Sequence, residues 1–124
     1  MKKFPFLVVI FAALASITFT SAYSQADKNV VVLVQYKTQP GKDSVALSTL
    51  KDLINKVKLE PYYVNIVLHV DPVDRSNILL YEEWSDEVYY NGEHMKTAHL
   101  KEFINNAGGF LAGPPSISFW TVSK

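Results

Sequence analysis

The sequence predicts an α+β domain of the ferredoxin-like βαββαβ type, with an antiparallel sheet. Four short runs rich in β-branched and aromatic residues alternate with two segments of helical periodicity, in the order strand, helix, strand, strand, helix, strand. The chain has 124 residues, and setting aside an N-terminal leader leaves about 100, which suits one domain. We therefore expect a single sheet of four strands with both helices on one face.

The first 24 residues have the layout of a secretory signal. A basic start, Met1-Lys2-Lys3, precedes an apolar run over residues 4–19, and small residues follow at Ala22 and Ser24. Cleavage after Ser24 would make residues 25–124 the mature domain, and cleavage after Ala26 is the alternative. The run is short for a membrane span of about 20 residues, so we expect cleavage without a stable membrane anchor, and a secreted or periplasmic protein.

The charge balance argues against nucleic acid as a partner. Without Lys2 and Lys3 the mature chain has 10 basic and 12 acidic side chains, and Arg75 is its one arginine. Binding to a phosphate backbone needs a basic patch, usually with arginine. The chain has no cysteine, which excludes disulfides and a lipid-bearing cysteine.

The first half of the domain predicts a strand and a helix. Residues 30–37 are β-branched and end at the break Pro40-Gly41, and helical periodicity then runs over residues 42–58. Either Asp43 or Ser44 is expected to cap this helix. Its predicted core stripe consists of Val45, Leu47, Leu50, Leu53, Ile54 and Val57.

The second half predicts a hairpin, a broken helix and a last strand. Residues 62–71 and 77–84 flank a turn rich in Asp and Pro, so they should pair as a hairpin. Residues 86–106 are helical but interrupted at Asn91-Gly92, and residues 116–122 form the fourth strand. Because the strands are apolar on both faces while helices are available for only one, we expect a second copy of the chain to cover the other face in a homodimer.

Four short motifs in this order resemble the antibiotic biosynthesis monooxygenase family of dimeric α+β barrels. They cover residues 30–122 and are Tyr36-Lys37-x-x-Pro40-Gly41-Lys42, Leu79-Leu80-Tyr81-Glu82-Glu83-Trp84, His94-x-Lys96-Thr97-Ala98-His99 and Gly113-Pro114-Pro115. The resemblance implies either cofactor-independent oxygenation of quinols or phenols, or haem degradation. Haem-degrading relatives carry an Asn on the first strand and a His late in the second helical region. Val34 and Ile104 stand there, which argues against haem degradation.

The candidate site residues lie in and around residues 81–99. His94 is the first choice for a catalytic base, since the ordinary pKa of histidine, about 6.5, suits proton abstraction near neutral pH. Glu82 either orients a histidine or serves a structural role, such as accepting backbone hydrogen bonds or pairing with a lysine across the dimer. The proposed substrate-binding residues are Asn65, Trp84, His99, His69 and Tyr81, with a structural role in the core or at the surface as the alternative for each.

No cofactor or metal is expected. His94 and His99 are five residues apart, so on a continuous helix they diverge by more than a quarter turn and do not make a bidentate site. Motifs for flavin, nucleotide or a Ser-His-Asp triad are absent from the sequence. The sequence thus predicts an exported, cofactor-independent monooxygenase acting on a small aromatic or quinol with O2. A non-catalytic small-ligand-binding protein of the same fold is the alternative.

Overall fold

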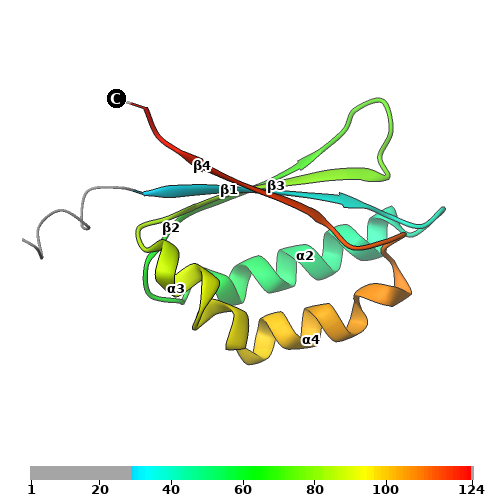
Figure 1. The fold of residues 1–124 in the computed structure, drawn as a ribbon. Helices are drawn as coiled ribbons and strands as arrows, with labels where there is room; N and C mark the ends of the chain where they lie inside the picture. The colour runs from blue at the N-terminus through cyan, green and yellow to red at the C-terminus, as the bar shows by residue number, and fades with distance from the viewer. Residues whose placement is uncertain (1–28, 124) are drawn as a thin grey trace, which may run out of the picture.

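The computed structural model describes residues 29–123, so the predicted signal over residues 1–24 lies outside the described residues. Strands and helices alternate in the predicted order, and the helices lie on one face of the sheet (Figure 1). The ferredoxin-like α+β class is therefore confirmed. The elements are β1 (Val30–Lys37), α2 (Asp43–Val57), β2 (Tyr63–Val70), β3 (Asn77–Trp84), α3 (Glu87–Asn91), the short 3-10 turn η1 (His94–Lys96), α4 (Ala98–Asn106), the 3-10 turn η2 (Ala107–Gly109) and β4 (Ser116–Thr121).

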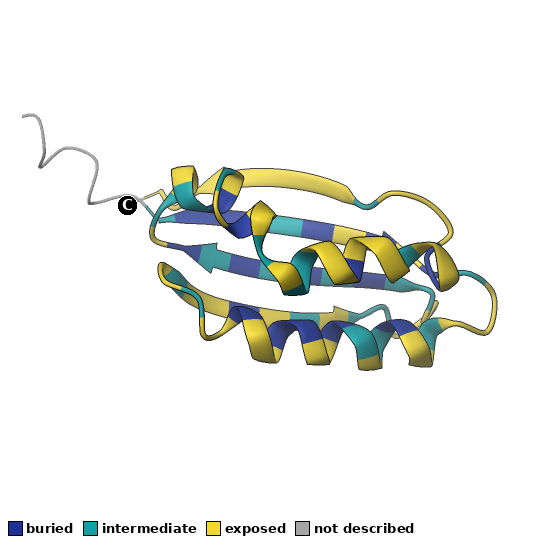
Figure 2. Cartoon of the chain, turned by 90° about the horizontal axis from the view of Figure 1, so that it is seen from below, coloured by how far each residue is buried: buried dark blue, intermediate teal, exposed yellow. Residues whose placement is uncertain are grey.

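The sheet is antiparallel with the strand order β2-β3-β1-β4, so the two strands richest in buried residues are central. Val32 of β1 pairs with Glu82 of β3 and with Phe119 of β4. Side chains alternate between faces along a strand, so these three residues share the face covered by the helices. From the helix side, the two middle strands carry most of the buried residues and the outer faces of the helices are exposed (Figure 2).

The first helix differs from its prediction at its start. It begins at Asp43, and neither Asp43 nor Ser44 caps it: Lys42 occupies the N-cap position and makes no side-chain cap hydrogen bond. The carboxylate of Asp43 instead accepts a hydrogen bond from Nε of Arg75 at 3.3 Å. Ala46 is buried in place of Val45, because the stripe that meets the sheet runs at i, i+4, i+7 and i+8 from Ala46.

The second helical region is broken where the sequence predicts it. Asp86 caps α3 by accepting a hydrogen bond from the backbone N–H of Tyr89 at 3.0 Å. The chain then turns at Gly92, where an added Cβ would lie 3.1 Å from the carbonyl oxygen of Val88. This break lets η1 point inward, so His94 is only 3% exposed although it lies in a segment without regular α-helix.

The opposite face of the sheet has no helix over it within residues 29–123. A bulge between Tyr63 and Asn65 puts Asn65 opposite Glu83, so both residues lie on this face. Trp120 of β4 also lies there and is 57% exposed. We call this surface the open face and the other the covered face. In the described part of the chain, no helix is both long and apolar enough to cross a membrane.

Candidate functional site

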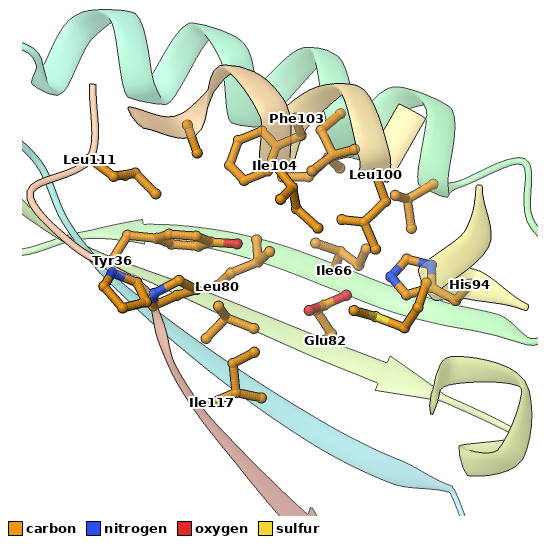
Figure 3. Close-up of a pocket in the computed structure, with 18 of the residues that line it drawn as sticks. Tyr36, Ile66, Leu80, Glu82, His94, Leu100, Phe103, Ile104, Leu111 and Ile117 are labelled. Atoms are coloured by element: carbon orange, nitrogen blue, oxygen red, sulfur yellow. The ribbon is translucent and has the colours of Figure 1, made fainter. Parts of the chain in front are cut away.

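A cavity of about 390 Å³ lies between the covered face and the helices. Its walls come from β1, β3, α2, α4 and the loop before β4, and they are mainly aliphatic and aromatic (Figure 3). Small-molecule sites in proteins typically occupy roughly 300–1,000 Å³, so this volume suits a small ligand. The polar side chains at the cavity are few, and Tyr36, Glu82, Tyr90 and His94 supply them.

His94 is fixed at one end of the cavity by the carboxylate of Glu60. Its Nδ1 lies 2.9 Å from Oε1 and 3.1 Å from Oε2 of Glu60. The same carboxylate accepts hydrogen bonds from the hydroxyl of Tyr89 at 2.9 Å and from Nε2 of His99 at 2.7 Å. Glu60 lies just after α2, so the end of the first helix reaches across to the second helical region.

Glu60 is ionised although its side chain is only 6% exposed. Burial alone would raise its pKa, but hydrogen bonds from His99, His94 and Tyr89 hold the pKa below its ordinary value. An ionised carboxylate only accepts hydrogen bonds, so Nδ1 of His94 must carry a proton and donate it. Nε2 is then the ring nitrogen of His94 that remains available to a ligand.

Two neighbouring aromatic rings pack against the imidazole of His94. Its centroid lies 4.7 Å from that of Trp84 and 4.9 Å from that of Tyr90, and the Tyr90 ring is stacked at an interplanar angle of 22°. Trp84 is completely buried. The ring therefore has a restricted orientation, which is what a proton-transferring group requires.

Glu82 lies at the same end of the cavity as His94 (Figure 3). It is 5% exposed, and its one side-chain hydrogen bond within the described residues comes from Nε1 of Trp84 at 3.2 Å. Burial raises the pKa of Glu82 to about 7, and the negative charge of Glu60 adds to this effect. Burial and the charge of Glu82 also raise the pKa of Tyr36 and of Tyr90, so both hydroxyls keep their protons.

The structure brings together only some of the residues predicted from sequence. His94 and Glu82 line the cavity, and Trp84 packs behind His94. His99 lies beyond Glu60 and borders a second, smaller pocket of about 80 Å³. Of the two roles expected for Glu82, the described residues show no hydrogen bond from Glu82 to a histidine: its side-chain hydrogen bond is with Trp84, and Glu60 is the carboxylate that contacts His94 and His99.

Asn65, His69 and Tyr81 do not line the cavity. The register places Asn65 opposite Glu83, Val67 opposite Tyr81 and His69 opposite Leu79, so all three lie on the open face. Sequence reasoning missed Glu60, Tyr36 and Tyr90 as site residues. In the sequence, Glu60 indicates only the end of a helix. The signal available was its position beside Pro61, outside any predicted strand or helix, where a carboxylate is free to contact a histidine.

No group of His, Cys, Asp or Glu side chains with the arrangement of a metal site occurs among residues 29–123. Compared with known protein families, residues 29–106 match the model of the antibiotic biosynthesis monooxygenase family. The match covers more than half of the chain. This protein belongs to the antibiotic biosynthesis monooxygenase family. No match was found among proteins with curated descriptions.

Solved structures of proteins from other organisms have a fold similar to that of this antibiotic biosynthesis monooxygenase family member. A putative antibiotic biosynthesis monooxygenase from Bordetella bronchiseptica is 13% identical, with a TM-score of 0.71 over 79% of this chain and 100% of that one. Another from Nitrosomonas europaea is 16% identical, with a TM-score of 0.71 over 76% and 89%. A conserved protein from Methanosarcina mazei Go1 is 20% identical, with a TM-score of 0.70 over 79% and 96%. At these identities the likeness concerns the fold alone.

Proposed function

We propose that this family member is an exported, cofactor-independent monooxygenase that oxidises a small phenol or quinol with O2. The observation that carries the proposal is His94, held by the ionised Glu60 at the end of an apolar cavity, with Nε2 available to a ligand. The family match supports this class of chemistry, and the residues must supply the rest.

The first step is removal of the phenolic proton by Nε2 of His94. Glu60 favours this step because its negative charge stabilises the imidazolium that forms, through a hydrogen bond of 2.9 Å to Nδ1. A positioned general base contributes typically about 100- to 10,000-fold in rate. The apolar walls then keep water away from the phenolate.

Oxygen is the oxidant and the substrate supplies all the electrons. The phenolate gives one electron to O2, and the phenoxyl radical and superoxide combine to form a C–O bond at a ring carbon that bears hydrogen. The resulting peroxide takes a proton, loses the ring C–H proton and breaks its O–O bond. One oxygen atom remains as a quinone carbonyl and the other leaves as water. We assign Glu82, whose pKa is raised to about 7 by burial, as the donor of the proton that the leaving oxygen needs.

Oxygen consumption by the mature domain tests the proposal. With 1-naphthol or menadiol, we expect uptake of O2 above the rate without protein. With 18O2, one labelled atom should enter each quinone formed from 1-naphthol. Labelled product formed at the same rate without protein, or no uptake with a broad panel of phenols and quinols, would contradict the oxygenase proposal.

A second function is favoured by the mainly apolar lining of the cavity, which could hold a ligand without changing it. In that case the protein is an exported binding protein of the same fold. Tight binding of aromatic ligands without any oxygen uptake would support it over the oxygenase.

We also propose that two copies associate through their open faces, which keeps Trp120 and the apolar side chains around it from water. Trp120 is 57% exposed in the single chain, and Leu33 and Leu79 lie on the same face. A stable interface should bury more than roughly 1,000 Å² in total. Light scattering at low micromolar concentration should give a dimer, and Trp120→Asp should give a monomer. A wild-type monomer would contradict this arrangement.

Export is proposed from the sequence of the leader. Mass spectrometry of the protein outside the cytoplasm should find an N-terminus near Gln25. A chain that retains Met1 in the membrane fraction would overturn it.

A further inference from the structure

Glu82 presents an uncommitted carboxyl oxygen to the cavity. Its Oε1 accepts a hydrogen bond from Nε1 of Trp84 at 3.2 Å, and no side chain among residues 29–123 hydrogen-bonds to Oε2. Glu82 as a residue is 5% exposed, so the surrounding side chains shield its carboxyl group from most of the bulk water. A carboxyl oxygen that lines a mainly apolar cavity favours a hydrogen-bond donor, and a ligand in the cavity can provide one.

Among the described residues, the cavity lining contains an acidic side chain, Glu82, but no lysine or arginine. The titratable groups that face Glu82 are Tyr36 from β1, Tyr90 from α3 and His94 from η1, while the charge of Glu60 lies behind His94. Glu82 and His94 lie at the same end of the cavity (Figure 3), and neither Oε2 of Glu82 nor Nε2 of His94 hydrogen-bonds to a side chain of residues 29–123.

We propose that Glu82 makes the cavity selective for uncharged phenols, accepting a hydrogen bond from a ring hydroxyl and excluding aromatic carboxylates. A hydroxyl donates a strong, charge-assisted hydrogen bond to a carboxylate. A ligand carboxylate would instead place a second negative charge beside Glu82, and the described residues that line the cavity include no Lys or Arg to compensate either charge. The inference rests on the proposed function for the chemical class of the ligand. It concerns the bound state before reaction, in which the single hydroxyl of a phenol donates to Glu82; transfer of that proton to Nε2 of His94 belongs to turnover.

Calorimetric titration of the full mature chain with three matched probes tests it. The probes are 1-naphthol, 1-methoxynaphthalene and 1-naphthoate, which share a ring system and differ in donor capacity and charge. At about pH 8, where Glu82 is ionised, 1-naphthol should bind about 10-fold more tightly than the methoxy compound, which lacks the donor. It should bind about 100-fold more tightly than 1-naphthoate, since like charges brought together cost several kcal/mol.

Glu82→Gln should reduce the preference for 1-naphthol over 1-naphthoate to below about 10-fold, because the charge is gone while a hydrogen-bond acceptor remains. Glu82→Leu should also abolish the preference over 1-methoxynaphthalene. Glu83→Gln is the matched control, since Glu83 is adjacent in sequence but lies on the open face, where Oε1 accepts a hydrogen bond from Asn29 at 3.0 Å. It should leave both preferences unchanged.

Equal affinity of the wild type for 1-naphthol and 1-naphthoate would overturn the inference. So would a preference that persists in folded Glu82→Gln and Glu82→Leu. Selective binding without oxygen uptake would leave the inference standing and overturn only the oxygenase proposal. If 1-naphthol does not bind at all, the cavity is not an aromatic site and both proposals fail.

Discussion

The two faces of one sheet differ in what they can do, although the same strands build both. On the covered face, Glu82 is buried and its pKa is raised to about 7. One residue later in the same strand, Glu83 lies on the open face beside Asn29. The same contrast separates His94, 3% exposed beside Glu60, from His69, which is exposed on β2. The helices thus enclose Glu82 and His94 beside a cavity, while Glu83 and His69 stay on the open face of the same sheet.

The largest expected effect concerns the two tryptophans. Trp84→Ala removes a completely buried ring that supports His94 and should lower the free energy of unfolding by about 3–5 kcal/mol. Trp120→Ala, on the open face, should lower it by less than about 1 kcal/mol at protein concentrations where any dimer dissociates. Urea denaturation measures both. Equal losses would mean that the open face is as much a core as the covered one.

Glu82 should make the protein less stable as the pH rises. Below about pH 4.5 the carboxyl of Glu82 is protonated in the folded and unfolded chains alike, so folding does not bury a charge there. Between about 4.5 and 7 the unfolded chain ionises first, so the folded state loses about 3 kcal/mol relative to it. Denaturation at about pH 5 and about pH 8 should show this loss.

The matched variants sharpen this comparison. Glu82→Gln should be more stable than the wild type at the higher pH and nearly equal to it at the lower one. Glu83→Gln should follow the wild type at both. If Glu82→Gln gives no relative gain, the carboxyl is not buried as the structure places it.

Glu60 should act in the opposite sense, because its pKa is lowered in the fold. The stability it contributes is present above the ordinary pKa of a glutamate and is lost as the pH falls through its lowered value. Glu60→Gln should remove this acid sensitivity and cost about 1–3 kcal/mol at neutral pH, since the hydrogen bonds of the buried His94 and the partly buried His99 lose their charged acceptor.

Glu93→Gln is the control for Glu60, because the Glu93 side chain is 72% exposed and, within residues 29–123, its ion pair is with Lys96 on the surface. It should change the stability by less than about 0.5 kcal/mol. In nuclear magnetic resonance spectra, His94 should be protonated on Nδ1 in the wild type. It should lose that fixed tautomer in Glu60→Gln but keep it in Glu93→Gln.

Local patterns were enough to predict the fold and only part of the site. β-Branched runs, helical spacing and the break at Asn91-Gly92 are local signals, and the structure confirms the elements they predict. His94 and Glu82 were found because both fall in a short stretch dense in polar and aromatic groups. Glu60 was missed because its partners are 29 to 39 residues away in sequence, a pairing that depends on the packing of α2 against α4.

Asn65 was misplaced for a different reason. The sequence pattern puts Tyr63 on the same face of β2 as Asn65 and His69, but the bulge between Tyr63 and Asn65 places Tyr63 opposite Trp84 on the covered face. The alternation holds from Asn65 onward, and the pattern alone did not decide which face meets the helices. Ile66 and Leu68 turn inward because they match Glu82 and Leu80 on β3, and this leaves Asn65 and His69 on the open face. The N-cap of α2 was misjudged because Asp43 contacts Arg75 from a distant turn.

The central claim is that His94, on the covered face, is the base of a cavity where an aromatic substrate is oxidised. Its most direct test is the steady-state rate of oxygen uptake with 1-naphthol for His94→Gln and for the control His69→Gln. The account predicts a loss of about 100- to 10,000-fold for His94→Gln and an unchanged rate for His69→Gln, with both variants folded. A His94→Gln variant that turns over at the wild-type rate would contradict it.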